Sequence, residues 1–558
     1  MAALAASFRP GADALYFLPL GGSGEIGMNL NLYGHAGKWL MVDLGIGFSD
    51  ETMPGIDILV PDIAFIRERR RDLVGLVLTH AHEDHLGAVQ HLWSELECPV
   101  FASPFTAAVL RAKLHEGGLV NRIKITEVPR SGTVSIGPFE VKMIGVTHSI
   151  PDSRVLVVRT SAGTVVHTGD WKLDAEPLVG PLTDEDSLAA LATQNVLALV
   201  GDSTNAPVPG YSGTEASVRE GLTQVIGRYE GRVAVTCFST NVARLEAVAA
   251  AAAVHDRRVA LIGRSLWRIY GAARSCGYLA DLPEFVSEHD AGYLPRNKIV
   301  LVCTGSQGEP RSALSRIAAS DHPQVVLERG DVVIFSSRDI PGNERAVALV
   351  QDRLLRRRIE VVTVNQEPVH VSGHPAQEEL LRMLAWVKPR ILVPVHGECR
   401  HQSAHVELAR QVGVTESIIP TNGMLIRLSP GPAEVVAEVH HGKMAIDGKR
   451  IVPLDCGAMR SRHRVIITGA VVVTVVLNVK GELVTTPKLS ILGLVDEQED
   501  RDLVLDVIDA VREAVGALSK AARADDQALI MAVRREVRCA FHASHGKKPQ
   551  TEVHLIRV

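Results

Sequence analysis

The sequence lacks several features that mark whole classes of protein. Its seven cysteines include no Cys-x-x-Cys pair, which argues against a disulfide scaffold or a zinc ribbon and favours reduced thiols. The 59 basic and 64 acidic residues leave a net charge of −5, so no overall positive field attracts nucleic acid. The N-terminus lacks the pattern of a signal peptide, and no apolar run is long enough for a membrane helix. These absences predict a soluble, cytoplasmic protein without a membrane partner.

What the sequence does contain is a dense group of metal-binding residue types: His80, His82, Asp84 and His85. An apolar run precedes this group and a helical pattern over 86–96 follows it, which predicts a loop between a buried strand and a helix. One metal ion can bind the first two residues, and a second ion about 3.5–4 Å away can bind the other two. The alternative is a solvated loop whose acidic residues stabilise the start of the helix.

Three further polar residues directly follow apolar strands: Asp43, His148 and Asp170. His148 can complete the first metal site, and Asp170 can bridge the two ions. The second ion then needs one more ligand. Asp43 either holds a ligand in position or caps a turn.

Strands and helices alternate regularly through the middle of the chain. Apolar strands are predicted at 233–238, 259–262, 299–303 and 332–335, with helices at 242–254, 266–276, 312–319 and 344–358. This alternation indicates a parallel sheet in an inserted domain. After it, His374 and His396 each follow an apolar strand. They match the missing metal ligand and an acid that faces a phosphate.

The order of these residues resembles the metallo-β-lactamase superfamily, and the insert resembles its β-CASP nucleases. The similarity is greatest to the ribonuclease J family. It rests on THAHEDH (79–85), HTGDWK (167–172), GDSTNAPVPGYS (201–212), TGSQGEP (304–310), FSSRDIPGNE (335–344), HVSGH (370–374) and PVHGE (394–398).

The resemblance implies an α/β fold: a metallo-β-lactamase αββα sandwich, an inserted Rossmann-like β-CASP domain and a small C-terminal α/β domain. We expect the sandwich to comprise 1–205 and, on return, 359–450, and the insert to comprise 206–358. A linker is expected at 451–464 and the C-terminal domain at 465–558.

The resemblance also implies roles for the site residues. Two Zn²⁺ ions per chain are expected, with Mn²⁺ or Mg²⁺ as substitutes. Their expected ligands are His80, His82, His148, Asp84, His85, His396 and the bridging Asp170. Asp202 and His374 are expected to be catalytic, and Asp43 to support the ligands from behind. Expected substrate contacts are His370, Val371, Ser372, Gly373 and His374.

These features together imply a zinc-dependent ribonuclease for RNA processing and mRNA decay. It would act as a 5′→3′ exonuclease on single-stranded RNA with a 5′-monophosphate end and also as an endonuclease. Expected partners are a second or further copies of the chain, as homodimer or homotetramer, and proteins of an RNA-degradation complex.

Three alternatives differ in what the site does. A hydrolase of small thioesters or lactones predicts no inserted domain, and the βα alternation argues against it. A non-catalytic RNA-binding scaffold predicts lost metal ligands, and all the candidate ligands are intact. A DNA-directed β-CASP nuclease is the nearest competitor, because only the 2′-hydroxyl separates the two substrates.

Overall fold

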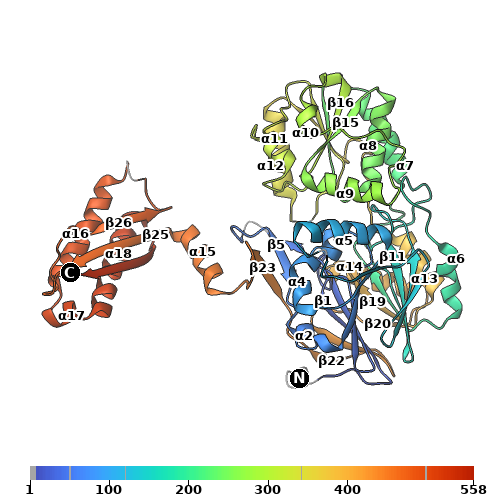
Figure 1. Ribbon diagram of the computed structural model, residues 1–558, viewed down its shortest axis with the longest axis horizontal. Coiled ribbons are helices and arrows are strands. Elements are labelled where there is room, and N and C mark those ends of the chain that lie inside the picture. Colours follow the sequence, from blue (N-terminus) through green and yellow to red (C-terminus); the bar gives the residue numbers. More distant parts are fainter. Residues whose placement is uncertain (1–7, 50–51, 120, 341, 497–498) are drawn as a thin grey trace. The chain divides into compact units, whose positions relative to one another are not determined.

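The computed structural model describes residues 8–49, 52–119, 121–340, 342–496 and 499–558 (Figure 1). The chain divides into two compact units. The first contains the described residues up to Gly47 together with Leu59–Lys443, and the second contains Phe48–Ile58 and Met444–Val558. None of the helices in the described ranges combines the length and the apolar character needed to cross a bilayer.

Two large sheets form the centre of the first unit. The eight-stranded sheet has the order β22 (Glu434–Glu438), β21 (Met424–Ser429), β1 (Leu15–Gly21), β2 (Leu30–His35), β3 (Lys38–Val42), β6 (Leu73–Val77), β7 (Val100–Ala102) and β8 (Ile125–Glu127). The seven-stranded sheet has the order β20 (Glu416–Ser417), β19 (Ile391–Val395), β13 (Ala198–Asp202), β12 (Gly163–His167), β11 (Arg154–Thr160), β10 (Phe139–Gly145) and β9 (Thr133–Ile136).

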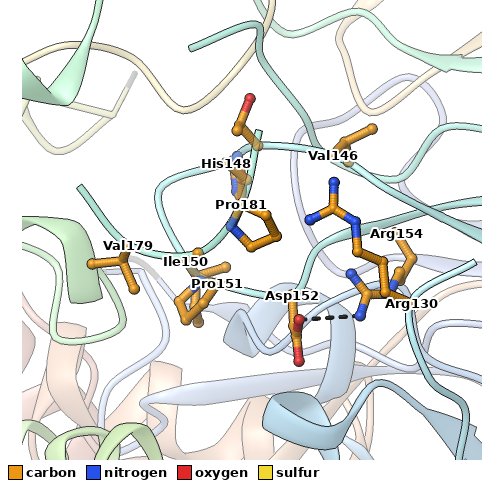
Figure 2. Close-up of a pocket in the computed structure, with 11 residues that line it drawn as sticks. Arg130, Val146, His148, Ile150, Pro151, Asp152, Arg154, Val179 and Pro181 are labelled. Carbon is orange, nitrogen blue, oxygen red and sulfur yellow. Dashed lines mark hydrogen bonds and ion pairs between the residues drawn. The ribbon is translucent and has the colours of Figure 1, made fainter. Parts of the chain in front are cut away.

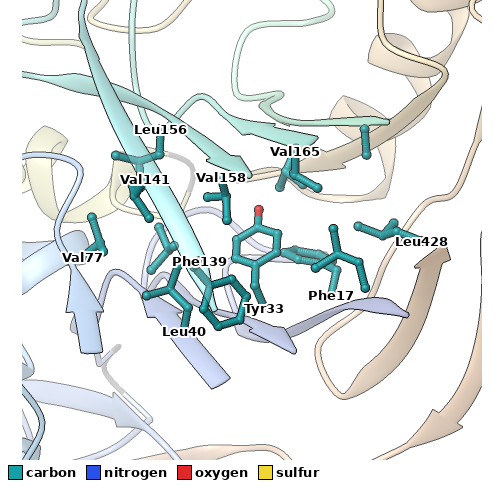
Figure 3. Close-up of a cluster of buried hydrophobic side chains, with 14 of the residues drawn as sticks. Phe17, Tyr33, Leu40, Val77, Phe139, Val141, Leu156, Val158, Val165 and Leu428 are labelled. Carbon is teal, nitrogen blue, oxygen red and sulfur yellow. The ribbon is translucent and has the colours of Figure 1, made fainter. Parts of the chain in front are cut away.

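The two sheets pack face to face over one apolar core (Figure 3). Phe17 and Tyr33 from the first sheet meet Val141, Val158 and Val165 from the second, and all five are buried. Alternating strand residues reach this core because successive side chains of a strand point to opposite faces. The sheets therefore form the inner layers of the expected αββα sandwich.

Helices cover the outer faces of the sandwich. Those beside the first sheet are α2 (Ala64–Arg67), α3 (Glu83–Leu86), α4 (Val89–Leu96) and α5 (Pro104–Glu116), and those on the second are α6 (Glu185–Ala189), α13 (Gln377–Val387) and α14 (Cys399–Gln411). The helix predicted over 86–96 begins at Val89 as α4, because a turn at Gly87 and Ala88 separates it from α3. A Cβ at Gly87 would lie 2.5 Å from the Glu83 carbonyl oxygen and 2.9 Å from Ile46, so the turn packs too closely for a larger residue.

The inserted domain is a five-stranded parallel sheet. Its order is β15 (Arg258–Ile262), β16 (Ile299–Cys303), β14 (Val233–Thr236), β17 (Val332–Phe335) and β18 (Glu360–Val362). Its helices are α7 (Glu215–Ile226), α8 (Val242–Val254), α9 (Arg264–Ser275), α10 (Glu288–Ala291), α11 (Ala313–Ala318) and α12 (Glu344–Arg356). The expected return to the sandwich at 359 needs a correction, since β18 pairs in parallel with β17 and extends the inserted sheet.

The second unit has a three-stranded sheet in the order β26 (Lys488–Leu492), β25 (Ala470–Leu477) and β27 (Gln550–Arg557). Its helices are α15 (Gly457–Thr468), α16 (Arg501–Ala517), α17 (Lys520–Ala524) and α18 (Asp526–His545). Short strands near the unit boundaries are β4 (Gly47–Phe48), β5 (Ile58–Pro61), β23 (Lys443–Asp447) and β24 (Arg450–Pro453). The segment expected as a linker, 451–464, thus holds most of β24 and much of α15.

Candidate metal centre

Strand ends bring the candidate ligands to one edge of the sandwich. The loop after β6 carries His80 and His82, and Asp170 and His396 follow β12 and β19. Strands β12, β13 and β19 are parallel neighbours, so their C-terminal ends meet at the same edge. Asp202 ends β13 between the other two strands.

Three groups of ligand atoms result, and within each group the atoms lie within 4.8 Å of one another. Asp170 belongs to all three. The groups are His80, His82, His148 and Asp170; Asp84, His85, Asp170 and His396; and Asp170, Asp202, His374 and His396. The structure therefore brings all seven expected metal ligands and both expected catalytic residues together.

The donor set fits divalent metal ions. Nδ1 of His82 lies 3.0 Å from Nε2 of His80 and 3.1 Å from Nε2 of His148, so three nitrogen lone pairs converge. Oδ1 of Asp170 is buried and hydrogen-bonds to none of the described residues. A buried carboxylate oxygen without a donor is costly unless a cation neutralises it. Imidazole and carboxylate are ligands that zinc accepts.

The first group is poised to donate electron pairs. Burial is the largest cause that lowers the pKa of His80, His82 and His148, and it lowers the pKa of His82 to about 4. Neutral imidazole is the form that binds metal. These three side chains therefore need lose no proton near pH 7 to act as ligands.

In the second group, the pKa values of the histidines are raised and not lowered. Burial would lower the pKa of His396, but the nearby carboxylates, Asp170 first, raise it to about 10. Burial would also lower the pKa of His85, but Asp170, Asp84 and Asp43 raise it. The pKa of Asp170 is lowered, because His396, His85 and His374 outweigh its burial. In this part of the site, protons on imidazole compensate carboxylate charge, which is the task a cation would take over.

Groups behind the ligands fix their orientation. Asp43 lies with Oδ2 2.7 Å from Nδ1 of His85 and accepts hydrogen bonds from the Thr79 amide and hydroxyl, both at 2.8 Å. Nδ1 of His148 donates to the Gly373 carbonyl oxygen at 2.5 Å, which leaves its Nε2 facing the other histidines. Partners of this kind set the tautomer and direction of a ligating imidazole.

We expect Asp43→Asn to lower metal affinity and kcat/KM by roughly 10–100-fold, the usual effect of removing such a partner. The amide nitrogen cannot accept the hydrogen bonds that one carboxylate oxygen now accepts. Metal titration and RNA cleavage assays measure the two effects. Asp72→Asn is the control, because Asp72 belongs to a partly exposed ion pair with Lys38. Wild-type affinity and rate in Asp43→Asn would contradict this role.

The expected catalytic pair is in direct contact. Nδ1 of His374 lies 2.8 Å from Oδ2 of Asp202, and Oδ1 of Asp202 accepts from the Thr204 amide and hydroxyl at 2.9 and 2.7 Å. Burial opposes the charge on His374, but Asp202 and then Asp170 raise its pKa. The pair therefore holds a proton beside the ligand cluster.

The two halves of the expected substrate segment, 370–374, differ in their distance from the ligand groups. Ser372 accepts a hydrogen bond from Asn205 at 2.7 Å, and Gly373 lies so near His148 that a Cβ would come within 2.8 Å of Cε1. His370 and Val371 lie outside the ligand groups: Val371 packs against Gly213, and Nδ1 of His370 is buried.

A buried ion network holds this segment from behind. Arg244 is fully buried and donates to Glu215 at 3.1 Å, to the Val369 carbonyl at 3.2 Å and to the Ser336 carbonyl at 2.7 Å. Lys172, two residues after Asp170, is also buried and pairs with Asp174 at 3.1 Å. The network thus connects the inserted domain with the backbone that leads to His374.

Three residues with contacts in the site were not predicted from the sequence. Thr204 contacts Nδ1 of His396 at 2.8 Å, Asn29 contacts Nε2 of His85 at 3.0 Å, and Asn205 contacts Ser372. Thr204 and Asn205 directly follow Asp202, and Asn29 ends the glycine-rich turn before β2. Their positions in these motifs are the sequence feature that could have identified them.

Family models match almost the whole chain. They are the metallo-beta-lactamase superfamily (28–210), the ribonuclease J beta-CASP domain (230–354), the Zn-dependent metallo-hydrolase RNA specificity domain (358–420) and the ribonuclease J C-terminal domain (457–558).

Individual relatives extend the same similarity. Ribonuclease J of Sinorhizobium meliloti is 45% identical over 551 residues, or 98% of each chain. Ribonuclease J of Mycolicibacterium smegmatis is 40% identical over 82% of each chain, and that of Synechocystis is 37% identical over 87% of this chain and 76% of its own. A crystal structure of a protein of unknown function from Enterococcus faecalis shares the fold, with a TM-score of 0.52 and 16% identity over 74% of this chain and 100% of that chain.

Proposed function

Because this chain belongs to the ribonuclease J family and is a metal-dependent hydrolase that acts on RNA, we propose that it is a two-zinc nuclease with 5′→3′ exonuclease and endonuclease activity. The observation that carries the proposal is the position of Asp170, which all three ligand groups share beside the 370–374 segment. We further propose a cytoplasmic homodimer or homotetramer that processes ribosomal RNA and degrades mRNA, as the family resemblance implies.

In this proposal His80, His82 and His148 hold one ion, and Asp84, His85 and His396 hold the other, with Asp170 between them. Bound there, the ions would supply a nucleophile near neutral pH and offset the negative charge of the scissile phosphate. Ser372 and the backbone of Gly373 bind that phosphate, because glycine lets the chain approach an oxyanion closely.

His374 acts as the general acid. Its Nδ1 is held by Asp202, so Nε2 is the nitrogen that remains to give a proton to a leaving group. The oxygen of water adds to the phosphorus, the bond to the 3′-oxygen breaks, and that oxygen takes the proton from His374; the proton that the water loses passes to solvent, from which His374 is protonated again. The downstream product then carries a 5′-phosphate, so the same end group is regenerated after each cut.

One RNA prepared with either a 5′-monophosphate or a 5′-triphosphate tests the proposal. We expect mononucleotide release from the monophosphate form alone, and complete loss of cleavage when a zinc chelator is present. Chromatography of 3′- and 5′-labelled products distinguishes the terminal from the internal cuts. A DNA strand of the same sequence is the third substrate. Preferential cleavage of the DNA, or no cleavage by the metal-loaded protein, would contradict the proposal.

A further inference from the structure

A cavity of about 480 Å³ lies between the sandwich and the inserted domain, apart from the ligand groups. Its walls come from α5, the segment after β8, the start of β11 and the residues at the end of α9. A cavity of this size accommodates a small organic ligand. Arg130, Asp152 and Arg154 of its lining also line a smaller pocket that His148 borders (Figure 2). The arginines therefore stand between the cavity and the metal centre.

Two guanidinium groups of this wall lie close enough for the charge of one to act on the other. Arg154 is 2% exposed, and its Nε hydrogen-bonds to none of the described residues. Arg130 donates to the Leu182 carbonyl oxygen, and within the described ranges it forms no ion pair with a carboxylate. Burial and then the charge of Arg154 lower the pKa of Arg130. An anion in the cavity beside these groups would offset the repulsion between them.

The carboxylates of the lining are already engaged. Asp152 accepts from Arg154 at 3.0 Å, from the Tyr278 hydroxyl at 3.1 Å and from the Phe105 amide at 3.2 Å. Glu127 pairs with Arg111. Asp184, which also acts on Arg130, accepts hydrogen bonds from Ser131 and Ser187. Three arginines against two carboxylates leave the cavity lining with one net positive charge.

The remaining walls suit a flat, mostly apolar group. Pro104, Pro129 and Ala108 line the cavity together with Tyr278, whose ring packs edge-on against Phe105 with a centroid distance of 5.9 Å. The Tyr278 hydroxyl is tethered to Asp152, so the ring is held in place. An aromatic ring beside a cationic wall is the combination that binds a base and its phosphate.

We propose that this cavity is a second nucleotide site, which binds a nucleoside 5′-monophosphate with its phosphate against Arg130 and Arg154 and its base toward Tyr278. The proposed binding of a nucleotide depends on Arg130, Arg154 and Tyr278 and does not require the proposed nuclease activity. The identification of the ligand as a reaction product rests on the proposed 5′-exonuclease activity, which would release such a nucleotide beside His148.

Cys276 offers a direct readout in the wild-type, full-length protein, since it lines the cavity and is a free thiol. Its modification by N-ethylmaleimide can be followed by mass spectrometry with and without AMP. At ten times the Kd, AMP should slow the modification by about tenfold, because only the free fraction reacts. The exposed Cys399 and Cys539 should react at unchanged rates and serve as internal controls.

The ligand series separates the possible sources of the phosphate. We expect protection by AMP, weaker protection by inorganic phosphate and none by adenosine. Protection by a 5′-phosphorylated RNA without protection by AMP would overturn the proposal, because the cavity would then hold the RNA backbone. No protection by any of these compounds would also overturn it.

Arg130→Ala should weaken AMP protection about tenfold or more, the usual effect of losing a hydrogen-bonded charge. Arg159→Ala is the matched control, because Arg159 lies on the same strand as Arg154 but pairs with Glu140 on the surface. Protection that survives unchanged in a folded Arg130→Ala would overturn the assignment, and Arg130→Lys should keep part of the affinity.

The RNA cleavage assay, run without added nucleotide, tests the proposed exonuclease activity independently of the proposed nucleotide site. AMP protection in a protein that releases no mononucleotides would support the site and remove its product role.

Discussion

Replacing Asp170 by alanine should strongly reduce both the rate of catalysis and the metal content of the purified protein. Asp170 is 2% exposed and is the one side chain common to the three ligand groups. Metal ions contribute several kcal/mol to such a reaction, and each 1.36 kcal/mol is a factor of ten in rate, so we expect roughly a thousandfold loss. Rates on a 5′-monophosphorylated RNA and metal analysis by mass spectrometry measure the two effects.

Two details sharpen this experiment. Asp186→Ala is a suitable control, since Asp186 is an exposed acidic residue in the first turn of α6. The other side chains of the three ligand groups must keep their positions in the variant. Near-ultraviolet circular dichroism monitors whether the tertiary packing around them is unchanged. An Asp170→Ala protein with full metal content and full activity would refute the ligand assignment.

The second large effect concerns stability. Arg244→Met should destabilise the first unit by about 3–5 kcal/mol, because the buried Glu215 then keeps only Lys172, 3.8 Å away, as a cation, and the carbonyls of Val369 and Ser336 each lose one donor. The midpoint of urea unfolding measures the loss. Activity should fall as well, since the Val369 carbonyl precedes the segment that contains His374.

The same pair of helices provides the control. Arg219 on α7 and Glu246 on α8 form a more exposed ion pair, with the Arg219 side chain 42% exposed. Arg219→Met should therefore cost at most about 1 kcal/mol. If Arg244→Met unfolds at the wild-type urea concentration, the buried network contributes no stability. If both variants lose equal stability, burial is not the cause.

Much of the sandwich and the positions of its candidate ligands could be predicted from local patterns. The apolar runs before His80, His148, Asp170 and His396 predicted strand ends, and parallel pairing through β13 brings the ends before Asp170 and His396 together. The residue at which each strand ends then follows from the local sequence. The contact of the HVSGH segment with substrate stays a prediction; within the segment, Ser372 contacts Asn205 and Val371 packs against Gly213.

The partners of the ligands could not be predicted, because tertiary packing determines them. His148 and Gly373 are 225 positions apart, and no local pattern shows that an imidazole of one will donate to the carbonyl of the other. The sheet that β18 joins depends on its fit to β17, since a strand of three residues with two valines suits either sheet. The close approach of Ile46 to Gly87 likewise depends on tertiary packing, since the two residues lie far apart in the chain.

The pairing of β13 with β19 has a consequence during protein synthesis. Asp202 is aligned with Val395, so a ribosome that has made β13 must add the whole inserted domain before its neighbour exists. At 5–20 residues per second this takes roughly 10–40 s, with a sheet edge left open. Until then the nascent chain lacks both His374 and His396. The candidate metal centre is thus completed only after the inserted domain has been translated.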